Sequence, residues 1–188
     1  MDIDAANNRL LLAIKDAEPG GENYKGIYAF DLVSKKMQGE PAYKIDLDHS
    51  LLQDDKGKKK SSGIMPSAIT IHPSTKELFI TDGRKSKLLV LDNKGDVKKL
   101  YKLDKQSFAQ PEGITFTPAG ELFISNEGPK QPANILKVEI SEQKKIIYRL
   151  KRQAKQCLSF FYTLYTKGLF QLLHLTNEKN NHEPCHFI

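Results

Sequence analysis

Two glutamates, Glu112 and Glu127, are the residues whose types and spacing most favour chemistry. Glu112 stands just before one predicted strand, and Glu127 stands just after the next. Because the start of an antiparallel strand lies beside the end of its neighbour, both carboxylates are expected at the same edge of a sheet. Carboxylate oxygens are ligands of hard cations, and calcium tolerates irregular oxygen cages. The pattern predicts a calcium site; the alternative is that both are solvated loop acids.

Three more oxygen-bearing side chains occupy equivalent strand ends. Asn126 directly precedes Glu127, Asp82 holds the position of Asn126 one repeat earlier, and Ser67 holds the position of Glu112. If these strands line the central channel of a propeller, all of these groups meet at one mouth of that channel. We therefore predict Glu112 and Glu127 as the metal ligands, with Asn126, Asp82 and Ser67 as their neighbours.

The sequence has none of the common catalytic motifs. Gly-x-Ser-x-Gly, the phosphate-binding loop, Gly-x-Gly-x-x-Gly and His-Glu-x-x-His are all absent. His72, beside Pro73 at a strand end, is interpreted as a turn residue rather than a general base. No catalytic residue is predicted, and an enzyme is the less favoured function.

An internal repeat organises the chain. Residues 66–73 (PSAITIHP) match residues 111–118 (PEGITFTP), 45 positions later, and residues 77–82 (ELFITD) match residues 121–126 (ELFISN), 44 positions later. A weaker copy begins at Asn8. Apolar and polar residues alternate within each copy, as they do in half-buried strands. Strand-rich repeats of this length are typical of propeller blades; a meander or sandwich is the alternative.

The predicted fold is all-β: a partial β-propeller of about three antiparallel blades with a C-terminal extension outside the repeat. The boundaries that we expect are blades at 1–47, 64–104 and 110–140, a polar insert at 48–63, and an irregular or helical tail at 141–188. Since closed propellers have four or more blades, the sequence is expected to be a fragment.

Charge argues against nucleic acid as a partner. Residues 1–140 contain 21 Lys and Arg against 20 Asp and Glu, whereas residues 141–188 contain 8 against 3. The net charge of +6 therefore belongs mainly to the tail, and the repeat region has no excess of positive charge to bind phosphates. The basic run from Lys56 to Lys60 follows Asp54 and Asp55, and we interpret it as a solvated loop.

The tail carries both cysteines and three of the five histidines. Cys157, Cys185, His174 and His182 lack the spacing of a zinc finger, so neither zinc nor a disulfide is predicted. The apolar stretch from Cys157 to Leu175 contains Lys167, which argues against a transmembrane segment.

The residues around the two glutamates also carry a family resemblance. QPEGITF at 110–116, followed by GELFISNEG at 120–128, resembles the SdiA-regulated family of bacterial propellers, distant relatives of NHL-repeat proteins. The resemblance covers about residues 1–140. It implies a β-propeller with calcium at Glu112 and Glu127, a location at the cell envelope and no established enzyme activity. No signal or membrane anchor is visible in the sequence.

Three functions remain open. The favoured one is a calcium-binding interaction module of the bacterial cell envelope, with an unknown protein or small-molecule partner. The second is a calcium-dependent hydrolase or lyase of the NHL-like type, and the third is a metal-free protein-interaction scaffold. A histidine or tyrosine beside the ion would favour the enzyme.

Overall fold

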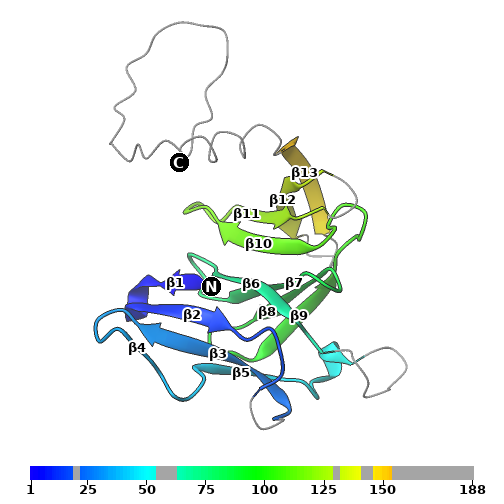
Figure 1. The fold of residues 1–188 in the computed structure, drawn as a ribbon. Helices are drawn as coiled ribbons and strands as arrows, with labels where there is room; N and C mark the ends of the chain where they lie inside the picture. The colour runs from blue at the N-terminus through cyan, green and yellow to red at the C-terminus, as the bar shows by residue number, and fades with distance from the viewer. Residues whose placement is uncertain (19–21, 54–62, 129–131, 141–145, 154–188) are drawn as a thin grey trace, which may run out of the picture. The chain divides into compact units, whose positions relative to one another are not determined.

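Three antiparallel sheets follow one another along the chain, as the sequence predicts (Figure 1). The computed structural model describes residues 1–18, 22–53, 63–128 and 132–140, and the backbone of residues 146–153. Each sheet corresponds to one copy of the repeat, and we call them blades 1, 2 and 3. The all-β fold and the arrangement as successive propeller blades are confirmed.

Blade 1 contains five strands and two short 3-10 helices: β1 (Asp2–Asp4), η1 (Ala5–Asn7), β2 (Arg9–Ala13), β3 (Tyr24–Asp31), β4 (Lys36–Met37), β5 (Tyr43–Asp46) and η2 (Ser50–Leu52). Blade 2 contains β6 (Pro66–Ile71), β7 (Leu78–Asp82), β8 (Lys87–Leu91) and β9 (Val97–Lys102). Blade 3 contains β10 (Pro111–Phe116), β11 (Leu122–Asn126), β12 (Asn134–Ile140) and β13 (Ile146–Gln153). Strands β4 and β5 both pair with β3.

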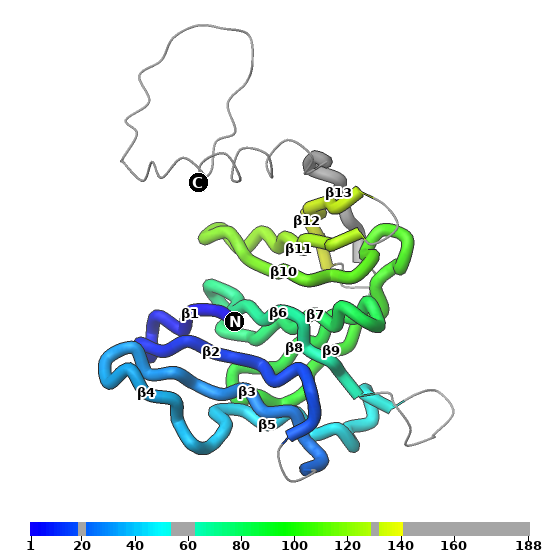
Figure 2. The backbone as a smooth tube through the Cα atoms, viewed as in Figure 1, coloured from blue at the N-terminus to red at the C-terminus, as the bar shows by residue number. Residues whose placement is uncertain are grey.

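The first strand of each blade lies next to the first strand of the following blade. Strand β6 contacts β1 on one side and β10 on the other, as the smooth backbone trace also shows (Figure 2). Innermost strands have this arrangement in a propeller, with the remaining strands of each blade following outward.

Two apolar clusters hold the blades together, one at each junction. The cluster between blades 1 and 2 includes Leu11, Ile27, Ile69 and Ile80, all with exposed fractions of 1% or less. The cluster between blades 2 and 3 is built around the following buried side chains: Phe79, Leu88, Val90, Phe108, Leu122, Ile124, Leu136 and Val138. Successive side chains of a strand point to opposite faces of the sheet, so the central strands of blade 2, which are apolar on both faces, present one apolar face to each neighbouring blade.

Polar contacts between the innermost strands supplement this packing. The Ser67 hydroxyl donates to the Pro111 carbonyl across the junction at 2.6 Å. Asp2 Oδ2 accepts from the Thr70 hydroxyl and from the Ile71 N–H, each at 2.9 Å. Each junction thus has at least one hydrogen bond near the inner end of its blades.

The structure corrects two expectations about the parts of the chain. The third blade does not end at residue 140, because β13 pairs along the whole of β12. The insert at 48–63 is not solvated throughout, because Leu52 is buried in the cluster between blades 1 and 2.

Other expectations lie outside the described residues. They include the basic run Lys56–Lys60 and the tail from 154 to 188 with its cysteines. Within the described ranges, no helix has the length and apolar character needed to cross a membrane.

Removing the hydroxyl in Ser67→Ala should lower the free energy of unfolding by about 1 kcal/mol, because the Pro111 carbonyl loses its donor across the junction. Denaturant unfolding followed by circular dichroism measures this change. Ser74→Ala is the matched control, since Ser74 is exposed and only its backbone N–H is bonded. Equal midpoints for both variants would contradict the role of Ser67.

The Tyr28 hydroxyl should lose its proton at an unusually high pH because of its contact with Glu18. The Glu18 carboxylate is buried; it accepts the Gly26 N–H at 2.5 Å and the Tyr28 O–H at 2.9 Å. This hydrogen bond to the carboxylate raises the pKa of Tyr28 to about 12. Glu18→Gln should lower that pKa toward 10, in an ultraviolet titration where Tyr28→Phe identifies the Tyr28 step. An unchanged high-pH step in Glu18→Gln would refute the assignment.

Candidate functional site

The predicted site lies where β10 begins and β11 ends, and the backbone there is irregular. Pro111 pairs with Asn126, but the register shifts between Pro111 and Gly113, which leaves Glu112 in a β-bulge. Blade 2 repeats this feature, with Ser67 in the bulge between Pro66 and Ala68. Such bulges redirect a side chain away from the regular alternation. The positional equivalence of Ser67 and Glu112 is therefore a property of the backbone.

The Glu112 carboxylate lies against blade 2. A Cβ atom added to Gly83 would come within 2.5 Å of Glu112 Oε1 and 3.0 Å of the Pro111 carbonyl oxygen. Only glycine therefore fits at residue 83 with this carboxylate in place. The Glu112 side chain itself is exposed.

Glu127 reaches the same edge but contacts a different neighbour. Its N–H donates to the Gln110 carbonyl at 3.0 Å, and its carboxylate accepts from the Gln110 side-chain amide. The backbone places the two glutamates at one edge, while their carboxylates bind different partners.

Asp82 and Asn126 occupy equivalent strand ends but differ in their hydrogen bonds. Both are buried, with exposed fractions of 0% and 3%. Asp82 accepts backbone N–H groups from Met65, Arg84 and Lys85 at 2.8–3.0 Å. Its carboxylate therefore fixes the turn after β7 and is already occupied.

Asn126 keeps one oxygen unused. Its amide nitrogen donates to Asn134 Oδ1 at 2.7 Å, but Asn126 Oδ1 is buried and has no hydrogen-bond partner among the described residues. Buried polar atoms are almost always bonded, so an unsatisfied oxygen marks a place where a donor or a cation is expected. The sequence did not distinguish this oxygen from its satisfied counterpart in Asp82.

The oxygen atoms of these side chains are of the type that binds hard cations, but they are fewer than such a cation needs. Asn126, Glu112 and Glu127 supply oxygen ligands, whereas calcium takes six to eight. In the part of the chain that the structure describes, no three acidic, histidine or cysteine side chains gather as a metal site. The three side chains match calcium in ligand type, but the described residues do not gather into a metal site.

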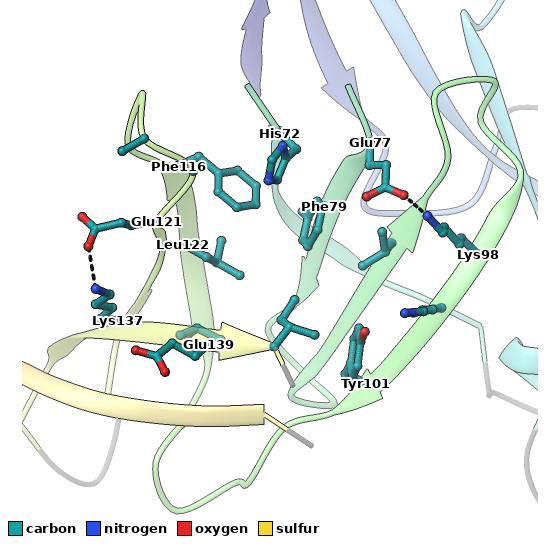
Figure 3. A pocket seen from close by; sticks show the side chains of 16 residues that line it. His72, Glu77, Phe79, Lys98, Tyr101, Phe116, Glu121, Leu122, Lys137 and Glu139 are labelled. Carbon is teal, nitrogen blue, oxygen red and sulfur yellow. Dashed lines mark hydrogen bonds and ion pairs between the residues drawn. The ribbon is translucent and has the colours of Figure 1, made fainter. Parts of the chain in front are cut away.

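A cavity of about 510 Å³ lies between blades 2 and 3 (Figure 3), and no motif in the sequence indicated it. Aromatic rings form part of its wall: Phe116 contacts His72 at 4.7 Å and Phe79 at 4.9 Å between ring centroids. Charged residues also line it, and two ion pairs join Lys98 to Glu77 and Lys137 to Glu121.

His72 lines this cavity but is committed to the turn that follows β6. Its Nδ1 atom accepts the N–H groups of Ser74 and Thr75 at 3.2 and 3.1 Å. An Nδ1 that accepts two hydrogen bonds requires the neutral tautomer with its proton on Nε2. The interpretation of His72 as a turn residue is confirmed.

Comparison with known proteins adds a family and distant structural neighbours. The family model described as SdiA-regulated matches residues 37–162. Virginiamycin B lyase from Staphylococcus aureus is 18% identical with a TM-score of 0.41, over 80% of this chain and 44% of that one. A streptogramin B lyase structure is 15% identical with a TM-score of 0.38, over 81% of this chain and 48% of that one.

The chain thus spans less than half the length of each of these lyases. Among curated proteins, none matches it significantly. The family model covers more than half of the chain, including all of blades 2 and 3. The chain belongs to the SdiA-regulated family.

Proposed function

We propose that this chain is a binding module of the bacterial cell envelope that holds a calcium ion at the edge formed by β10 and β11. In this proposal the ion orders the edge, and the module binds a protein or small-molecule partner without catalysing a reaction. The envelope location is supported by the family resemblance. The near-neutral charge of residues 1–140 supports a partner other than nucleic acid.

The unsatisfied oxygen of Asn126 is the observation that carries the metal proposal. This oxygen is buried, and amide oxygens are ligands of hard cations. The next residue in the sequence is Glu127, the second proposed ligand. Burying an amide oxygen without a partner costs free energy, which a bound cation would recover. Asp82 avoids this cost at the equivalent position of blade 2 through three N–H donors.

The two glutamates supply the charge in this proposal. Both are exposed, so each side chain can leave its present contact at low cost. Glu112 would approach from the bulge at the start of β10, and Glu127 from the end of β11. An ion bound between them would offset their mutual repulsion.

Calcium binding should be weak, with a dissociation constant on the order of 10⁻⁴–10⁻³ M, because the described ligands are few and two are exposed. At a calcium concentration ten times the dissociation constant, the chain should gain roughly 1.4 kcal/mol of stability. Calorimetric titration of the full chain measures the affinity, and thermal unfolding with and without calcium measures the stabilisation.

Glu112→Gln and Glu127→Gln should each weaken binding several-fold, because each removes a charged ligand. Glu139→Gln is the matched control: Glu139 is equally exposed but lies at the opposite end of β12 from Asn134. Equal affinities for all four proteins would remove these glutamates from the site. Absence of both heat and stabilisation would refute calcium binding by this chain.

A further inference from the structure

The cavity between blades 2 and 3 has a smaller counterpart between blades 1 and 2. The counterpart has a volume of about 230 Å³, against about 510 Å³ for the larger cavity. The smaller cavity is lined by Ile71 and Leu78, which pair with each other in blade 2. The larger one is lined by their equivalents in blade 3, Phe116 and Leu122. The two cavities therefore occupy the same position at successive junctions.

In the smaller cavity, an arginine joins the polar side chains to one another. Tyr43 lines this cavity, and its hydroxyl accepts from the Arg9 guanidinium at 3.1 Å. The same guanidinium donates from Nε to Asp4 Oδ2 at 2.8 Å and lies over the Tyr43 ring. Arg9 therefore engages both the tyrosine hydroxyl and the carboxylate at this junction.

The larger cavity keeps the tyrosine but lacks the arginine. Tyr101 holds the position of Tyr43, since both pair with equivalent residues of the preceding strand in their blades. Glu77 holds the position of Arg9, and its carboxylate forms an ion pair with Lys98. Tyr101 is only 5% exposed, yet its hydroxyl forms no hydrogen bond with any residue that the structure describes. Because buried tyrosine hydroxyls usually have a partner, this one is free to bind a ligand.

His72 brings a second donor to the larger cavity. Its Nδ1 atom accepts from the backbone of Ser74 and Thr75, so its proton is on Nε2, for which the described residues offer no acceptor. A Cβ atom added to Gly120 would lie 3.7 Å from this Nε2. In the repeat, the residue equivalent to Gly120 is Lys76, which lines the smaller cavity. The lack of a side chain at residue 120 therefore leaves space beside the Nε2–H group.

Lys99 supplies a positive charge on the blade 2 side of the cavity. It is exposed, and it has no ion pair with the part of the chain that the structure describes. The two other lysines that line the cavity are each paired with a glutamate. Glu139, which also lines the cavity, is exposed to solvent. Three available donors, one of them charged, thus stand against one solvated carboxylate, which favours an anionic ligand over a cationic one.

An aromatic wall lies at one end of the cavity. Figure 3 shows His72, Phe79 and Phe116 together at this end, and Tyr101 at the other. Phe79 and Phe116 meet edge to face with ring centroids 4.9 Å apart. A planar apolar group can stack against such rings. The cavity volume of about 510 Å³ lies within the range of roughly 300–1,000 Å³ that is typical of small-molecule sites.

We propose that this cavity binds a small aromatic carboxylate. The ring of the ligand packs against Phe79 and Phe116, and the carboxylate accepts from the Tyr101 hydroxyl and the Lys99 ammonium. These two residues are two positions apart in β9, so their side chains project from the same face of the strand. The Nε2–H group of His72 donates to an oxygen on the ring where the ligand carries one.

This inference rests on the proposed function only in treating the chain as a binding module. The cavity lies at the end of β10 that carries Phe116, whereas Glu112 is near the beginning of that strand. Measurements without added calcium therefore test the cavity independently of the calcium site.

Binding of indoleacetate to the full chain, measured by saturation-transfer NMR titration, tests the proposal. Tryptamine is the matched ligand, because it carries an ammonium group on the same ring system. Indoleacetate should bind with a dissociation constant on the order of 10⁻⁴–10⁻³ M, and tryptamine should bind about fivefold more weakly or worse. Absence of indoleacetate binding, or tryptamine binding of equal or greater strength, would overturn the proposal.

Two pairs of variants locate the ligand. Tyr101→Phe and Lys99→Gln should each weaken indoleacetate binding by about three- to tenfold, because each removes one donor to the carboxylate. Tyr43→Phe and Lys94→Gln are the matched controls and should leave the affinity unchanged: Arg9 already engages the Tyr43 hydroxyl, and Lys94 is exposed in the turn between β8 and β9. Circular dichroism checks that each variant is folded, and Lys99→Gln alters only an exposed side chain. Equal affinities for the cavity variants and the controls would refute this site.

Discussion

The contact between the first strand of one blade and the second strand of the preceding blade is the interaction on which this structure depends. Phe79 and Phe116 make it between blades 2 and 3, with ring planes 87° apart, and Leu11 and Ile71 hold the same positions between blades 1 and 2. These contacts fix the spacing of the innermost strands. The bulges at Ser67 and Glu112, and therefore the candidate calcium edge, are placed relative to one another by this packing.

The repeat itself could be predicted because alternation and spacing are local properties of the sequence. The match of ELFITD to ELFISN predicts β7 and β11 as equivalent strands of two blades. Strand β13 was missed, since its sequence from Ile146 to Gln153 shows no clear alternation and it is defined by backbone pairing with β12. Leu52 was assigned to a polar insert because its burial depends on contacts with residues distant in the sequence.

The candidate site shows the same division between local and long-range information. Antiparallel pairing was enough to predict that Glu112 and Glu127 share an edge with Asn126. It was not enough to predict that Asp82 is satisfied by three N–H donors while the Asn126 oxygen has none among the described residues. Antiparallel pairing also could not predict the cavity between blades 2 and 3. That cavity depends on how the facing sheets of the two blades diverge outside the apolar cluster that they share.

A double-mutant cycle on Phe79 and Phe116 tests most directly whether this contact holds the blades together. The free energies of unfolding of Phe79→Leu, Phe116→Leu, the double variant and the wild-type chain give the coupling between the two rings. We expect a coupling free energy of about 0.5–1.5 kcal/mol, the range for edge-to-face aromatic pairs. If the losses of unfolding free energy in the two single variants simply add up to the loss in the double variant, the two rings are not coupled and do not hold the blades together.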